Sequence, residues 1–260
     1  MQLENLLWRV EDGVGIVTFN RPKVLNAMNA RTFVDLEQLL DAVERDATVR
    51  ALVFTGAGDK AFVAGADIAA MAQMGPVEAR RFAETAHRLI ERLERLPIPT
   101  IAAVNGFALG GGCEFAMGCD IIYASEKARF GQPEVNLGLT PGFGGSQRLT
   151  RRVGIMRALE MVLTGDHYDA ARAKEMGLAL EVLPQDQLLP HAIAQAKKIA
   201  SKGPVAVAVA KRLVQAGADA DLTVANELER QAFAGLFGSE DAKEGMRAFV
   251  EKRAANWKGN

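Results

Sequence analysis

The sequence has little of what marks a secreted, zinc-binding or redox-active protein. Its 260 residues include two cysteines and three histidines. Cys113 and Cys119 are too few for a disulfide framework and do not form the C-x-x-C pair of zinc or redox sites, so we expect buried thiols. The histidines show no metal-ligand spacing and are interpreted as structural: His87, His167 and His191. We therefore expect no metal site.

An excess of basic charge and a long hydrophobic run are also missing. Lys and Arg number 31 against 32 Asp and Glu, a formal net charge of −1. Because nucleic-acid binding depends on an excess of basic side chains, this balance argues against a nucleic-acid partner. Apolar stretches such as residues 204–210 are much shorter than the roughly 20 residues that cross a bilayer. Residues 1–5 lack the basic and apolar regions of a signal peptide, so we expect a cytoplasmic protein with no membrane span.

What is present is the composition of a water-soluble globular protein, 49% hydrophobic and 24% charged. Residues 14–19 and 51–55 are rich in β-branched and aromatic side chains and end at turn signals, which predicts strands. Between them, apolar residues recur at helical spacing over residues 33–43. Residues 80–96 predict a further helix, and the apolar run 100–104 predicts a strand buried on both faces. The expected fold class is α/β.

Strand signals disappear after about residue 185. Helical periodicity continues to the end of the chain in four segments, which are residues 186–200, 204–217, 221–237 and 239–255. Their apolar faces either pack on the core of the same chain or bury themselves against another subunit.

Two segments rich in small residues follow predicted strands. In residues 61–68 the small side chains would leave backbone N–H groups at a helix start free to face a developing oxyanion, although a tight turn capped by Asp67 is the simpler alternative. In residues 105–114 three consecutive glycines carry a conformational cost, which close approach of a ligand would explain. Neither segment has the spacing of a dinucleotide-binding fingerprint or a P-loop.

Two glutamates are candidates for acid–base chemistry. Glu114 directly follows the glycine turn, and Glu134 follows a predicted strand at residues 128–130. A lone glutamate is usually a solvated surface charge. Two carboxylates that flank one water can divide the work of general base and general acid, which suits addition or removal of water.

A third glycine-rich loop, residues 141–146, leads into a predicted helix that carries Arg148, Arg151 and Arg152. It is either part of a binding site or a tight packing corner.

Taken in order, these motifs resemble the enoyl-CoA hydratase (crotonase) family. The likeness rests on residues 64–68, 105–114, 130–134 and 141–145 and extends from residue 20 to residue 249. It implies a spiral of ββα units with a C-terminal helical region that builds trimers, usually a dimer of trimers. We accordingly expect residues 1–195 to form the spiral core with the active site and residues 196–260 to form the region for subunit packing.

The resemblance also implies roles for residues. The backbone N–H groups of Ala66 and Gly111 would form an oxyanion hole for the thioester carbonyl of an acyl-CoA, Glu114 would activate water, and Glu134 would protonate C2. No cofactor is implied, because coenzyme A is part of the substrate. The substrate contacts implied are Lys23, Leu25, Ala64, Asp67, Ile68, Leu139, Gly142, Phe233 and Lys252. Many members have a lysine where this chain has Ala69, which leaves Lys23, Lys60 and a neighbouring subunit's Lys252 for the coenzyme A phosphates.

The resemblance therefore predicts an enoyl-CoA hydratase, which adds water reversibly and syn to a trans-2-enoyl-CoA to give a 3-hydroxyacyl-CoA. We expect substrates with short acyl chains and a role in fatty-acid or related acyl-CoA metabolism. The alternatives are an enoyl-CoA isomerase, a branched-chain enoyl-CoA hydratase, and a non-catalytic RNA-binding or scaffold protein on the same fold. The presence of both glutamates favours the hydratase.

Overall fold

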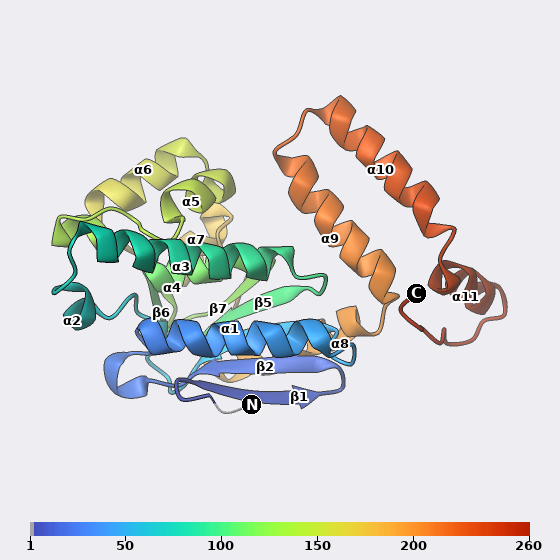
Figure 1. Cartoon of the computed structure of the whole chain (residues 1–260), viewed down its shortest axis with the longest axis horizontal. Helices are drawn as coiled ribbons and strands as arrows, with labels where there is room; N and C mark the ends of the chain where they lie inside the picture. Colours follow the sequence, from blue (N-terminus) through green and yellow to red (C-terminus); the bar gives the residue numbers. More distant parts are fainter. Residues whose placement is uncertain (1–2) are drawn as a thin grey trace.

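A six-stranded sheet forms the centre of the computed structural model, which describes residues 3–260 (Figure 1). Its strands, in spatial order, are β1 (Leu6–Glu11), β2 (Val14–Phe19), β3 (Ala51–Gly56), β5 (Thr100–Val104), β7 (Ile121–Ser125) and β10 (Glu181–Leu183). β1 and β2 form an antiparallel hairpin, and every other neighbouring pair is parallel. The strands predicted over 14–19, 51–55 and 100–104 are confirmed.

A second sheet of four short strands lies beside the first. Its strands, in spatial order, are β4 (Ala61–Val63), β6 (Phe107–Leu109), β8 (Arg129–Gly131) and β9 (His167–Asp169). β4, β6 and β8 follow β3, β5 and β7 directly along the chain, so the chain steps from the central sheet to the second sheet three times. This repeated step is the expected spiral of ββα units.

Helices cover both faces of the central sheet. The helical elements up to residue 200 are η1 (Pro22–Val24), α1 (Ala30–Arg45), α2 (Ile68–Met71), α3 (Pro76–Arg95), α4 (Gly111–Gly118), η2 (Pro133–Leu137), α5 (Gly145–Val153), α6 (Ile155–Thr164), α7 (Ala170–Met176) and α8 (Gln185–Ala200). Along β3, Leu52 and Phe54 pack in one core cluster with α1 and α3, whereas Ala51 and Val53 pack in a second cluster with α8. Burial on both faces is what the apolar strands predicted.

The last three helices extend away from this body (Figure 1). They are α9 (Pro204–Ala218), α10 (Leu222–Leu236) and α11 (Glu240–Val250). The predicted boundary between residues 195 and 196 lies inside α8, where Ala196 is fully buried in the core. The helices that leave the body therefore begin after α8, at Pro204.

Two predicted helix limits were wrong. The helix expected from residue 80 begins at Pro76, where a proline in the first turn loses no hydrogen bond. The helix expected to reach residue 255 ends at Val250, because Lys252 has a φ of +54° and the chain folds back on α11. There the Asp241 carboxylate accepts hydrogen bonds from the N–H groups of residues 258 and 259.

Both cysteines are buried free thiols, as expected. Within residues 3–260, no group of three or more His, Cys, Asp or Glu side chains is placed to hold a metal ion. None of the helices in that range has the length and apolar character needed to cross a membrane.

Candidate active site

A small cavity of about 110 Å³ lies where α2, α4, η2 and the loop before α5 meet. Apolar side chains and glycines form most of its wall, and Glu114 and Glu134 are the only charged side chains of residues 3–260 that line it. The structure thus brings together the two glutamates that the sequence singled out, twenty positions apart. Ala66 and Gly111 line the same cavity.

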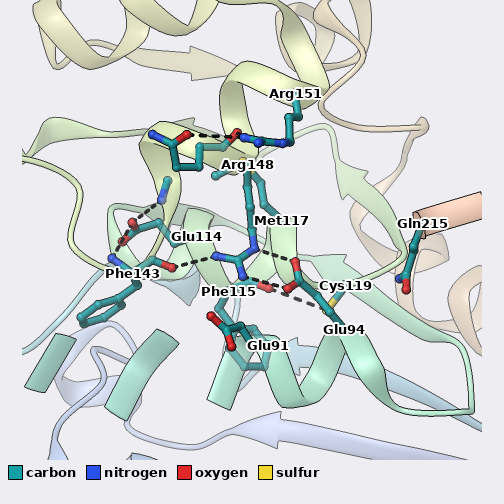
Figure 2. A network of polar contacts seen from close by, with 12 residues as sticks. Glu91, Glu94, Glu114, Phe115, Met117, Cys119, Phe143, Arg148, Arg151 and Gln215 are labelled. Carbon is teal, nitrogen blue, oxygen red and sulfur yellow. Dashed lines mark hydrogen bonds and ion pairs between the residues drawn. The ribbon is translucent and has the colours of Figure 1, made fainter. Parts of the chain in front are cut away.

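Glu114 sits in the first turn of α4 and is 1% exposed. Its Oε1 accepts hydrogen bonds from the backbone N–H of Phe143 at 2.8 Å and of Gly145 at 2.6 Å (Figure 2). The pKa of Glu114 is raised to about 7. Burial is the main cause and the neighbouring Glu134 charge adds to it, while the two N–H donors and the Arg148 charge act in the opposite direction. A carboxylate with this pKa changes its protonation near neutral pH, as a general base must.

Glu134 reaches the cavity from η2. Its Oε1 lies so close to Gly110 that a Cβ at that glycine would approach it to 2.9 Å. Its Oε2 is buried and has no hydrogen-bond partner among residues 3–260. Burial raises the pKa of Glu134 as well. An unpartnered, partly desolvated carboxyl oxygen is available to a water or a substrate in the cavity.

Two residues that line the cavity, Ala66 and Gly111, have backbone N–H groups without an acceptor in the described chain. Residues 64–67 lie beside residues 25–28 through backbone hydrogen bonds of 2.8 to 3.0 Å, which use the N–H groups of Ala64 and Asp67 but not that of Ala66. Gly111 is the first residue of α4, where an N–H has no intrahelical acceptor. Two free donors at one cavity make Ala66 and Gly111 candidates for an oxyanion hole.

Packing within the chain explains the three glycines before Glu114. A Cβ at Gly112 would lie 1.8 Å from the Val63 carbonyl oxygen, and one at Gly111 would lie 2.7 Å from the Phe143 ring. Gly110 has a φ of +49°, which favours glycine. Close packing of the protein on itself therefore requires these glycines. Close approach of a ligand to Gly110 and Gly111, which line the cavity, stays a prediction.

The other predicted contacts divide into three groups. Those that line the cavity are Ala64, Ile68, Leu139 and Gly142. Two support the 64–67 segment instead: the Leu25 carbonyl accepts from the Ala64 N–H at 3.0 Å, and Asp67 pairs with Arg21 at 3.1 Å. Those away from the cavity in this chain are the exposed Lys23, Lys60, Phe233 and Lys252.

Phe233 was expected at the acyl pocket, but within this chain it lies on α10, 64% exposed and paired with Phe237. Contact with the substrate stays a prediction for Phe233, as does contact with a neighbouring subunit's coenzyme A for Lys252. Sequence reasoning did not assign Phe143 or Thr140 to the site, although both line the cavity. Phe143 stands inside the third glycine-rich loop, so that loop was the available signal.

Comparison with known proteins agrees with this geometry. The family model for enoyl-CoA hydratase/isomerase matches residues 9–260. The chain belongs to the enoyl-CoA hydratase/isomerase family. This confirms the family that the sequence motifs resemble.

Similar members of the family include proteins whose names specify small substrates. The chain is 47% identical to the short-chain-enoyl-CoA hydratase of Clostridium acetobutylicum, covering 97% of each chain. It is 45% identical to the crotonyl-CoA hydratase of Syntrophomonas wolfei, covering 99% of each. Among solved structures, the enoyl-CoA hydratase of Bacillus anthracis matches with a TM-score of 0.95 at 39% identity, covering 99% of this chain and 100% of that one.

Proposed function

We propose that this protein is an enoyl-CoA hydratase that adds water to a trans-2-enoyl-CoA to give a 3-hydroxyacyl-CoA. The observation that carries the proposal is that two glutamates of raised pKa and two free backbone N–H groups face one small cavity. The hydratase names of its relatives support the same activity.

In this mechanism the Ala66 and Gly111 N–H groups donate to the thioester carbonyl oxygen, which polarises the conjugated double bond. Ionised Glu114 takes a proton from water as the oxygen attacks C3. The electron pair moves to the carbonyl oxygen, forming an enolate, and protonated Glu134 then delivers its proton to C2. The reaction leaves Glu114 protonated and Glu134 ionised, and a proton passed between them through water restores the starting state.

The proposed substrate has a short acyl chain. Ile68, Met71 and Leu139 enclose the apolar side of a cavity of only about 110 Å³. The two relatives named for short-chain and crotonyl substrates favour the same range. We further propose that no cofactor is needed besides the coenzyme A carried by the substrate.

We propose that the protein works as a homo-oligomer, a trimer or a dimer of trimers, in the cytoplasm. Support for assembly comes from α9 and α10, neither of which has a buried residue in the single chain. Large apolar side chains on these helices, such as Val214, Leu222 and Phe233, are 64% to 74% exposed. A second subunit is the surface that would cover them.

Hydration of crotonyl-CoA tests the proposal directly. Glu114→Gln and Glu134→Gln should each lower kcat by roughly 10²- to 10⁴-fold with little change in KM, because each removes a proton-transfer group and leaves the cavity's shape. Glu126→Gln, an exposed glutamate outside the cavity, is the matched control and should behave as wild type. Hydration within threefold of wild type in either active-site variant would refute the assigned roles. Product analysis with a trans-3-enoyl-CoA separates hydration from isomerisation.

A further inference from the structure

The turn at residues 143–145, which donates hydrogen bonds to the Glu114 carboxylate, itself accepts a hydrogen bond from Arg148. Phe143, Gly144 and Gly145 wrap around the Glu114 carboxylate, so that the N–H groups of the first and third residue both point to its Oε1. The carbonyl of Phe143 points the opposite way and accepts a hydrogen bond from Arg148 Nη1 at 3.1 Å (Figure 2). One residue of the turn therefore links Glu114 on one side to Arg148 on the other.

The Arg148 guanidinium packs closely against the turn. Gly144 has a φ of +101°, and a Cβ there would lie 2.0 Å from Arg148 Nη1. The guanidinium thus occupies the space that the missing side chain leaves. Only glycine at this position allows the turn its conformation and the guanidinium its place.

Glu94 of α3 fixes the other edge of the guanidinium. Its two carboxylate oxygens accept from Arg148 Nε at 2.6 Å and Nη2 at 2.8 Å, and the paired side chains are only 16% and 32% exposed. A bidentate pair of this kind sets the orientation of the guanidinium plane as well as its position. The chain of contacts from Glu94 through Arg148 to the turn ends at Glu114.

We propose that Arg148, oriented by Glu94, is a positioning residue for the acid–base chemistry, because it holds the 143–145 turn so that two N–H groups converge on Glu114. The inference rests on the proposed function in that Glu114 is the general base. Arg148 does not line the cavity and acts only through the turn.

The charge of Arg148 adds to this geometric role. It favours the ionised form of Glu114 and so opposes the rise in the pKa of that carboxyl that burial causes. Loss of the guanidinium would remove both this charge and the alignment of the two donors. Each change would make Glu114 harder to ionise.

The groups around Glu114 come from four elements. The titratable and charged side chains that face Glu114 or the turn are Cys113 of α4, Glu134 of η2, Arg148 of α5, and His87, Glu91 and Glu94 of α3. Arg148 is the positive charge that acts on Glu114 itself. The nearby Arg152 acts on Cys113 and Glu94 and donates to the Met117 and Cys119 carbonyls instead.

The test measures the protonation of Glu114 in three variants of the full-length protein. Arg148→Met removes charge and hydrogen bonds, Arg148→Lys keeps the charge but loses the bidentate geometry, and Glu94→Gln keeps the arginine but weakens its orientation. The readouts are the acid limb of the kcat–pH profile with crotonyl-CoA and an infrared titration of Glu114 without substrate, identified by subtracting the Glu114→Gln spectrum. Arg92→Met is the control, because Arg92 bridges α3 to Asp41 and Glu44 of α1.

We expect Arg148→Met to move both the acid limb and the Glu114 titration upward by about one pH unit, which lowers kcat at pH 7 by about fivefold. Glu94→Gln should shift less and Arg148→Lys least, and Arg92→Met should not shift at all. Should Arg148→Met fail to fold, the shifts in Arg148→Lys and Glu94→Gln decide. Glu114 titrating at its wild-type pH in the folded variants, or an equal shift in Arg92→Met, would overturn the inference. Because the infrared titration needs no turnover, wild-type inactivity toward enoyl-CoA would refute the proposed function separately.

Discussion

The α/β body buries its apolar side chains, whereas the last three helices leave large apolar side chains exposed. All five residues of β5 are buried, whereas α9 and α10 bury none. On α10 Phe233 is 64% exposed, and just before the end of α11 Phe249 is 86% exposed. The body completes its core within one chain, but the helices from Pro204 onward carry an apolar surface that this chain does not cover.

The attachment between the two regions includes polar contacts of defined geometry. Lys211 of α9 is 7% exposed and pairs with Asp120 at 2.8 Å, and it also donates to the Ile98 carbonyl at 3.0 Å. Gln215, one turn later, donates to Asp120 at 2.6 Å. These polar contacts fix the position of α9 against the body and leave apolar side chains such as Val214 exposed to another surface.

The largest effect is expected from removal of residues 221–260, which contain α10 and α11. If those helices cover each other between subunits, their loss exposes the remaining face of α9, and the protein should dissociate and become poorly soluble. Sedimentation velocity of the truncated and full-length chains measures this. A soluble, active monomer after truncation would contradict the account, as would a monomeric full-length chain.

The next largest effect is expected as a difference in stability between two Gly→Ala variants, one in the body and one in the last three helices. At Gly112 a Cβ would meet the Val63 carbonyl oxygen at 1.8 Å, so Gly112→Ala should destabilise the protein by about 3 kcal/mol or prevent folding. At Gly235 of α10 a Cβ has no neighbour within 4 Å, so Gly235→Ala should be neutral or stabilising by up to about 1 kcal/mol. Urea unfolding of both variants measures the difference. Equal effects would mean that α10 is packed as tightly as the body.

A smaller effect is expected at Glu114, where one substitution should raise the free energy of unfolding and abolish activity. The folded-state pKa of this group, about 7, lies above its ordinary value of 4.5, so its contribution to stability is full below about pH 4.5 and is lost as pH rises through 7. Glu114→Gln should therefore raise the free energy of unfolding at pH 8 by roughly 1 kcal/mol or more while abolishing hydration. Glu126→Gln should change neither. Denaturant unfolding at pH 5 and pH 8 gives the comparison, and a destabilised Glu114→Gln at pH 8 would be the contrary result.

The elements that sequence periodicity predicted are those with long, regular patterns. The apolar run of β5 and the repeating stripes of α8 to α10 are confirmed, because burial on both faces or on one helical face leaves a clear pattern. The strands of the second sheet span only three residues each, too short for a period to show, and of these four only the strand at residues 128–130 was predicted. The family resemblance, not periodicity, indicated the spiral that contains them.

Contacts between distant segments explain what the sequence could not predict. The glycines before Glu114 serve packing against Val63 and Phe143, which are far away in the sequence. Arg148 was visible as one basic residue of a helix, but its link to Glu94 spans 54 positions. A single sequence records neither pairing. The two glutamates were found because their chemistry, rather than their surroundings, marks them.

The central claim is that the N–H groups of Ala66 and Gly111 receive the carbonyl oxygen of a thioester between the two glutamates. Binding of cinnamoyl-CoA to the Glu114→Gln variant tests it most directly, because the ligand's absorbance reports polarisation of its carbonyl without turnover. We predict a clear red shift on binding, together with markedly weaker binding by calorimetry of the analogue whose thioester carbonyl is replaced by CH₂, since unpaired buried donors cost about 1–3 kcal/mol. An unshifted spectrum with equal affinity for the two ligands would contradict the claim and make Ala66 and Gly111 packing residues only.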